Sequence, residues 1–273
     1  KACRLAGKSS KDIIAITMPG FGTSGRTYNN AIKLMQNMGV TIKEISIKEA
    51  CIQHFKDIEH DIDNHDVTYE NSQARERTQI LMDIANRMNG IVIGTGDLSE
   101  LALGWATYNG DHMSMYGVNA SVPKTLMQHL VRHVAENSSK EEVKATLLDI
   151  IDTPISPELI PADNNGNIKQ KTEDLVGPYE LHDFFLYHFI RNGFTPEKIY
   201  FMAQKTFEGT HDAATIKKWL TTFMRRFFVQ QFKRSCMPDG PVTGHCNLSP
   251  QGGWIMPADI NGTAWNEACL KLE

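Results

Sequence analysis

The sequence predicts an α/β fold in which a parallel sheet carries helices on both faces and is followed by a mostly helical C-terminal half. Between residues 13 and 110, short apolar segments alternate with amphipathic segments, and strands that alternate with helices form parallel sheets. Beyond residue 122 the apolar residues recur almost entirely at helical spacing. We therefore expect an α/β nucleotide-binding core over residues 1–122 and a mostly helical part over residues 123–273.

Each expected element has its own pattern. Segment 12–19, "DIIAITMP", and segment 90–96, "GIVIGTG", are typical of buried strands, whereas residues 40–47 alternate with period two. The helical spacing over 27–38 ends at Gly39, a residue type favoured directly after a helix. Further helices are expected over residues 48–57, 68–88, 97–108, 123–136, 140–151, 180–194 and 212–235, and the Gly- and Pro-rich segment 237–263 is expected to be irregular.

The composition excludes several classes of protein. The net charge of −4 argues against a polybasic protein that binds nucleic acid. The five cysteines form no C-x-x-C pair, which indicates reduced thiols and a cytoplasmic protein. The apolar runs are too short to span a membrane. Because the chain opens on Lys1, in what looks like the tail of a helix, we expect a fragment without a secretory leader.

The first glycine-rich motif lies in "MPGFGTSGRTYNN". Gly20, Gly22 and Gly25 match G-x-G-x-x-G between a strand and a helix, and Glu44 follows about 20 residues on, where an acid could hold a ribose. Pro19 stiffens the turn, however, and the Thr and Ser residues of the loop could cap a helix without any pyrophosphate. The motif alone leaves open a dinucleotide site or a flexible loop at the carboxyl edge of the sheet.

A second motif, "IVIGTGDLSELALGWATYNGD", places polar residues where the third expected strand ends. Asp97 and Glu100 have the spacing of a capping box, so Glu100 could serve only the following helix. Alternatively, Thr95 and Glu100 face a polyphosphate and its Mg²⁺, because carboxylate oxygen is a ligand that this hard cation prefers. The spacing favours neither reading over the other.

The chain is similar to the synthetase domain of glutamine-dependent NAD⁺ synthetases. The resemblance covers nearly all of residues 1–273 and rests on four segments, "GTGDLSELALGWATYNGDHMSMYGVNASVPKTLMQHLVRHV", "TMPGFGTSGRTYNNAIKL", "TYENSQARERTQIL" and "QFKRSCMPDGP". It implies an ATP-pyrophosphatase-type fold, like that of the adenine nucleotide alpha-hydrolases, in which the first glycine loop is not a Rossmann fingerprint. The family's S-G-G-x-D-S phosphate loop and glutaminase domain are missing from this sequence, so we expect the fragment alone to be inactive.

The resemblance also implies binding residues, although it assigns no catalytic side chain. Thr95 matches a threonine that contacts ATP, and Glu100 matches a carboxylate associated with the substrate or with Mg²⁺. Lys233 matches a late basic residue that reaches the substrate, deamido-NAD⁺. The other positions implied to bind deamido-NAD⁺ are Asn71, Arg75, Trp105, Ala106, Thr107 and Tyr108.

The activity implied by the resemblance is that of a ligase of NAD biosynthesis. ATP adenylylates the nicotinate carboxylate of deamido-NAD⁺ and releases pyrophosphate, and ammonia, supplied from glutamine in the full-length enzyme, then displaces AMP to give NAD⁺. ATP and Mg²⁺ are the expected cofactors, and a homo-oligomer is expected, with neither nucleic acid nor membrane as a partner. Two other functions stay open at this stage: another ATP-pyrophosphatase amidotransferase, and a non-catalytic nucleotide-binding or assembly module.

Overall fold

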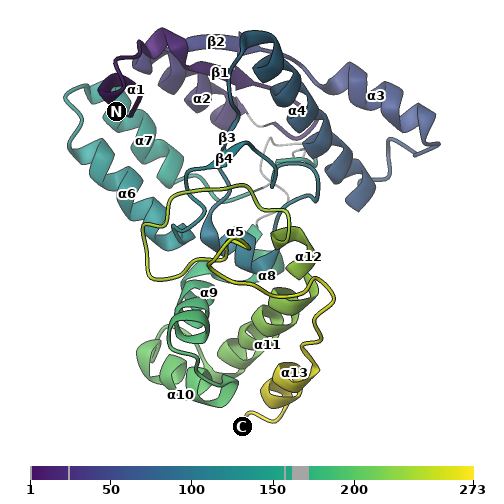
Figure 1. The fold of residues 1–273 in the computed structure, drawn as a ribbon, viewed down its shortest axis with the longest axis vertical. Helices are drawn as coiled ribbons and strands as arrows, with labels where there is room; N and C mark the ends of the chain where they lie inside the picture. Colours follow the sequence, from purple (N-terminus) through teal and green to yellow (C-terminus); the bar gives the residue numbers. More distant parts are fainter. Residues whose placement is uncertain (1, 24, 157, 162–171) are drawn as a thin grey trace. The chain divides into compact units, whose positions relative to one another are not determined.

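The computed structural model describes residues 2–23, 25–156, 158–161 and 172–273 (Figure 1). Contacts divide the chain into two compact units, each built from two stretches of sequence. Lys1–Leu81 and Gln128–Thr172 form the first unit, and Met82–Met127 and Glu173–Glu273 form the second. The domain division predicted at residue 122 stays a prediction.

A parallel pair of strands organises the first unit. β1 (Ile14–Thr17) pairs with β2 (Thr41–Glu44), with Ile14 opposite Thr41. The crossover between the two strands is α2 (Gly25–Met38), as the helical spacing predicts. All four residues of β1 are half-buried, so the prediction of a fully buried strand is wrong. The physical reason is that a sheet of two strands leaves each strand at an edge.

Gln73 anchors the glycine-rich loop that follows β1. Its side chain, fully buried on α4 (Val67–Met88), accepts a hydrogen bond from the Phe21 amide at 3.2 Å and donates one to the Leu159 carbonyl at 2.8 Å. Gly22 lies so close to the Glu158 carbonyl that an added Cβ would stand 2.5 Å from that oxygen. Packing therefore explains the glycine, and no dinucleotide is needed to account for it.

Helix α2 packs against both strands of the first unit. Cys51 and Phe55 on α3 form a buried cluster with Ile47 and Tyr69, and α7 packs against α2. The helices expected in this unit begin and end within two residues of their predicted bounds. The remaining bounds are Ala2–Leu5 for α1, Ser10–Asp12 for a 3₁₀ turn, Lys48–Asp57 for α3, Lys124–Glu136 for α6 and Glu141–Ile151 for α7. The first turn of α6 belongs to the second unit.

The strand pair of the second unit is shorter than predicted. The strand expected over 90–96 consists of Ile93–Gly94 (β3), which pairs in parallel with β4 (Tyr116–Gly117). Ile91 and Ile93 are 65% and 48% exposed, so the prediction of a buried strand is wrong here as well. Glycines weaken the interior of a strand, and this strand ends at Gly94, before Gly96. In the described residues, the parallel strands thus form two separate pairs.

Helix α11 is the centre of the helical core of the second unit. Helices α9, α10 and α13 pack against it (Figure 1), and Leu220, Phe223 and Phe227 on its apolar face are fully buried. The predicted amphipathic helix is confirmed, although it ends at Val229 and a separate turn follows. The bounds are Leu98–Leu103 for α5, Thr172–Val176 for α8, Tyr179–Leu186 for α9, Tyr187–Arg191 for a π-helical turn, Pro196–Thr206 for α10, Ala213–Val229 for α11, Gln231–Arg234 for α12 and Thr263–Leu270 for α13.

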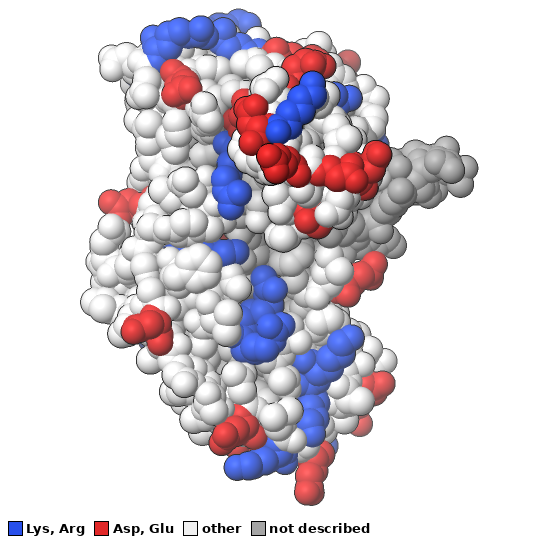
Figure 2. Space-filling view, turned by 90° about the vertical axis from the view of Figure 1, so that its right-hand side faces the viewer, with Lys and Arg blue, Asp and Glu red and all other residues white. Residues whose placement is uncertain are grey.

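No described helix combines the length and the apolar character that crossing a membrane requires. Figure 2 shows both basic and acidic side chains on the face that it displays.

His182 on α9 makes the stability of the second unit depend on pH. Its side chain is 1% exposed, and its Nε2 donates to the Val176 carbonyl at 2.6 Å. Burial lowers the pKa of His182 to about 4. Below the ordinary histidine pKa of about 6.5, the unfolded chain therefore binds a proton that the folded chain excludes, and stability is lost as the pH falls.

We predict that the free energy of unfolding drops by about 2 kcal/mol through His182 alone between about pH 7 and pH 4.5. In a His182→Gln variant, whose amide can still donate to the Val176 carbonyl, this part of the pH dependence disappears. Urea unfolding at both pH values, followed by the fluorescence of the neighbouring Trp219, measures the difference. Equal pH dependence in the two proteins would contradict the assignment.

Candidate ligand-binding site

A cavity of about 290 Å³ lies in the second unit, beyond the carboxyl ends of β3 and β4. Both parallel strands end at its wall, because Gly94 closes β3 and Gly117 closes β4. The carboxyl edge of parallel strands is where α/β proteins bind ligands. The other lining residues are Thr95, Gly96, Glu100, Leu101, Ala106, Asp111, His112, Ser114, Ala120, Lys124, Met237 and Pro238.

Glu100 caps a helix and lines the cavity at the same time. Asp97 Oδ1 accepts a hydrogen bond from the Glu100 amide at 3.0 Å, and Glu100 Oε2 accepts one from the Asp97 amide at 3.1 Å. This is the predicted capping box, at the start of α5. The other oxygen of Glu100, Oε1, accepts from Lys124 Nζ at 2.7 Å. The two readings of this carboxylate that the sequence leaves open are therefore compatible.

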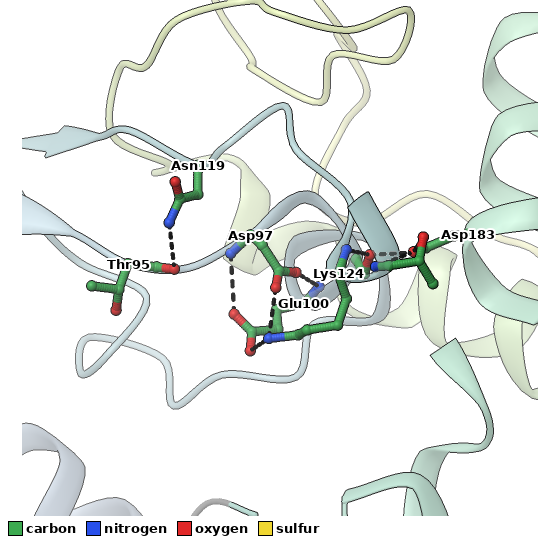
Figure 3. Close-up of polar contacts among 8 residues, drawn as sticks. Thr95, Asp97, Glu100, Asn119, Lys124 and Asp183 are labelled. Carbon is green, nitrogen blue, oxygen red and sulfur yellow. Dashed lines mark hydrogen bonds and ion pairs between the residues drawn. The ribbon is translucent and has the colours of Figure 1, made fainter. Parts of the chain in front are cut away.

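Lys124 joins the two carboxylates at the cavity wall. Figure 3 shows its ammonium between Asp97 Oδ2, at 2.6 Å, and Glu100 Oε1. The side chains of Asp97 and Lys124 are only 3% and 17% exposed, so solvent screens this cluster weakly. Burial and the charge of Glu100 raise the pKa of Asp97 to about 7, while Lys124 acts in the opposite direction. Burial lowers the pKa of Lys124, but the two carboxylates outweigh it and raise that pKa.

Lys124 was not among the predicted site residues, although its position in the sequence carries one signal. Lys124 is the first residue of α6 and follows Pro123. A cation in the first turn of a helix opposes the helix dipole. Such a residue indicates an acidic partner elsewhere in the chain, and the structure supplies two.

Cations bind the carbonyl groups at the other end of α5. Arg234, which is 1% exposed, donates from one nitrogen to the carbonyls of Leu101 and Ala102, each at 3.0 Å. Arg226 donates to the Leu103 carbonyl at 2.9 Å. The final carbonyls of a helix have no partner within it, and positive charge is favourable there. The basic segment of α11 and α12 therefore fixes the orientation of α5.

Lys233 holds the segment that follows α5. Its ammonium donates to the carbonyls of Gly104 and Ala106 at 2.8 and 2.6 Å. Burial, followed by the charge of Arg226, lowers the pKa of Lys233 to about 8. The contact of Lys233 with a substrate stays a prediction, whereas its contact with the chain shapes the cavity wall at Ala106.

Residues 105–108, which the resemblance implies bind the substrate, take different positions. Ala106 lines the cavity. Trp105 packs against the Arg226 guanidinium, whose carbon lies 5.3 Å from the ring centroid. The Thr107 carbonyl accepts from His112 Nδ1 at 3.1 Å, and the Tyr108 ring stacks on His112 with centroids 5.2 Å apart. His112 itself lines the cavity and was not predicted.

The remaining predicted residues lie in both units. Thr95 lines the cavity, and its carbonyl accepts from Asn119 Nδ2 at 3.3 Å (Figure 3). Asn71, which is half-buried, and Arg75, which is exposed, lie one turn apart on the part of α4 that belongs to the first unit. Their binding roles stay predictions.

Among the residues that the structure describes, no group of three or more His, Cys, Asp or Glu side chains is arranged to hold a metal ion. The donor set nevertheless fits Mg²⁺ bound with a nucleotide, because this ion typically takes one or two carboxylates together with phosphate oxygens and water. Glu100 is the carboxylate that meets this requirement, since it lines the cavity and its side chain is 25% exposed.

Comparisons with known proteins agree on one family. The NAD synthase family model matches residues 2–222. A glutamine-dependent NAD(+) synthetase from Mycobacterium leprae is 43% identical over 95% of this chain and 42% of its own length. One from Aquifex aeolicus is 31% identical over 69% of this chain and 32% of its own length. The chain thus spans about two fifths of the former relative.

A solved structure supports the fold class. The glutamine-dependent NAD(+) synthetase from Cytophaga hutchinsonii matches with a TM-score of 0.74 and 21% identity, over 94% of this chain and 40% of that one. At this identity the likeness concerns the fold. The predicted α/β class with parallel strands is confirmed.

Gly104 offers a test of how tightly the end of α5 is packed. It adopts φ 60°, and an added Cβ would stand 2.3 Å from Cβ of Gln230. Gly209 has a similar φ of 81° but has nothing within 4 Å of an added Cβ. We predict that Gly209→Ala costs about 1 kcal/mol of stability from backbone strain alone, and that Gly104→Ala costs clearly more. Urea unfolding measures both losses of stability. Equal losses would show that the Gln230 side chain moves away without a measurable cost.

Proposed function

Because the chain belongs to the NAD synthase family, we propose that it is the synthetase part of an enzyme that amidates deamido-NAD⁺ to NAD⁺. The family match over residues 2–222 and the names of the relatives support the proposal. The reaction would consume ATP and release AMP and pyrophosphate. Ammonia would come from glutamine through a glutaminase domain of the longer protein, and the protein would act in the cytoplasm as a homo-oligomer.

The observation that carries the proposal is the charged wall of the cavity. Lys124, Glu100 and the glycine turn around Thr95 converge at the end of β3. A carboxylate resists direct amidation because its leaving group would be oxide, whereas an acyl-adenylate expels AMP. A protein promotes that activation by aligning carboxylate and α-phosphate and by neutralising charge. We assign the charge of Lys124 to this task and Thr95 to contact with ATP.

Mg²⁺ would be held by Glu100 together with phosphate oxygens of the nucleotide. When bound, the ion supplies positive charge that makes the phosphorus a better electrophile. Lys124, which now pairs with Glu100 Oε1 at 2.7 Å, would then share that carboxylate with the ion and keep Asp97 as its second partner.

Residues 105–108 would provide the surface against which the pyridine ring lies. Lys233 holds this segment through the Gly104 and Ala106 carbonyls. Arg226 holds it through the Trp105 ring. The cavity of about 290 Å³ is slightly smaller than typical ligand sites, which span roughly 300–1,000 Å³. It would therefore take one portion of the substrates, such as the nicotinate with the adjoining phosphate, rather than a whole dinucleotide.

The decisive assay measures pyrophosphate release by the full-length protein that carries this chain, with ATP, Mg²⁺, glutamine and deamido-NAD⁺. Release with deamido-NAD⁺ is expected, and release with aspartate as the only acceptor is not. Turnover of another carboxylate instead would identify a different ATP-pyrophosphatase amidotransferase. A complete lack of turnover would favour a binding or assembly module.

We predict that Lys124→Gln lowers kcat/KM by about 100-fold or more, the cost of losing one group that stabilises transition-state charge. Lys205, exposed on α10, offers a matched control, and Lys205→Gln should keep the wild-type rate. Circular dichroism verifies that both variants fold. A fully active Lys124→Gln protein would contradict the role that we assign to Lys124 at the cavity wall.

A further inference from the structure

The first turn of α6 receives its caps from outside the helix. Pro123 precedes α6 and its side chain offers no acceptor, so the amides of Lys124 and Thr125 need partners elsewhere. Ser99 Oγ accepts from the Lys124 amide at 2.8 Å. Asp183 Oδ2 accepts from the Thr125 amide at 3.0 Å and from Thr125 Oγ1 at 2.7 Å (Figure 3).

Asp183 also determines how Ser99 is oriented. The Ser99 hydroxyl has a single proton, and it donates that proton to Asp183 Oδ1. Its lone pair is therefore directed at the Lys124 amide. Ser99 is 1% exposed and lies on α5 directly before Glu100. One carboxylate on α9 thus binds the start of α6 with one oxygen and, through Ser99, the start of α5 with the other.

We propose that Asp183 is a positioning residue, which holds the backbone of Lys124 in register with Asp97 and Glu100 so that the ammonium stays at the cavity wall. This inference rests on the proposed function in one respect, which is that Lys124 serves the reaction. Asp183 does not line the cavity, so it acts through Ser99 and the first turn of α6. An anionic cap also suits the positive end of the α6 dipole, and it offsets the unfavourable place of Lys124 there.

The Asp183→Asn variant tests the hydrogen bonds of Asp183 while keeping the size of its side chain. It keeps the shape of the side chain but leaves one acceptor oxygen, so either the Ser99 link or the Thr125 link is lost. We expect kcat/KM for ATP in the full-length protein to fall about 10- to 100-fold, the scale that a displacement near 1 Å produces. In a Lys124→Gln background the same change should cost less than about threefold, because the group that Asp183 positions is already gone.

A matched control removes a helix cap elsewhere in the same unit. Asp212 caps α11 by accepting from the Thr215 amide at 2.6 Å. Asp212→Ala should lower the melting temperature through the loss of this cap and leave kcat/KM unchanged. An Asp183→Asn loss of the same size in both Lys124 backgrounds would show a merely structural role and overturn the proposal.

Amide hydrogen exchange decides the question independently of turnover. Exchange in residues 122–127 should accelerate at least about tenfold in Asp183→Asn, and stay at the wild-type rate in Asp212→Ala. If the wild-type protein fails to convert deamido-NAD⁺, the proposed function is wrong while this readout still tests the link to α6. Unchanged exchange in Asp183→Asn would overturn the positioning role, and Asp183→Ala, which removes both oxygens, serves as the second variant.

Discussion

The site depends on one constraint: the backbone groups at both ends of the short helix α5 need hydrogen-bond partners, and the surrounding residues supply them. α5 has six residues, too few for a helix to persist through its own hydrogen bonds. Its start is closed by the Asp97–Glu100 box and Lys124. Its end is closed by Arg226 and Arg234. Because Lys124, Arg226 and Arg234 tie α5 to other elements, the helix and the Glu100 carboxylate have a defined position.

The charges of the site follow from the same constraint. Acidic groups lie at the start of α5 and basic groups at its end, as the helix dipole favours. Lys124 lies at the start of α6, where a cation is unfavourable, and its pairing with Asp97 and Glu100 compensates for this. A largely buried ion pair contributes little net stability compared with apolar packing. In this protein the pair holds a cation and a carboxylate side by side at the cavity wall.

Features that involve neighbours in sequence were predictable. The capping box joins residues three apart, and its pattern identified both the start of α5 and Glu100. The apolar spacing of α2, α3, α4, α6 and α7 identified those helices because 3.6-residue periodicity is local. Helix α10 was not predicted, although Thr195 and Pro196 form a helix-start signal. The family resemblance added residues 105–108 and Lys233 as binding residues, and their binding roles stay predictions.

The sequence by itself therefore determined most helices and the acidic start of α5, because each depends on residues within about one helical turn. It also determined the α/β class, because that class follows from the order in which such local patterns alternate along the chain. The tertiary structure alone decided which strand pairs with β3, which cation meets Glu100 and which carboxylate caps α6. Lys124 lies 24 residues from Glu100, and Asp183 lies 84 from Ser99. Such contacts leave no periodic trace in the sequence, since they depend on how the intervening chain packs and on the burial that makes each unpaired polar group costly.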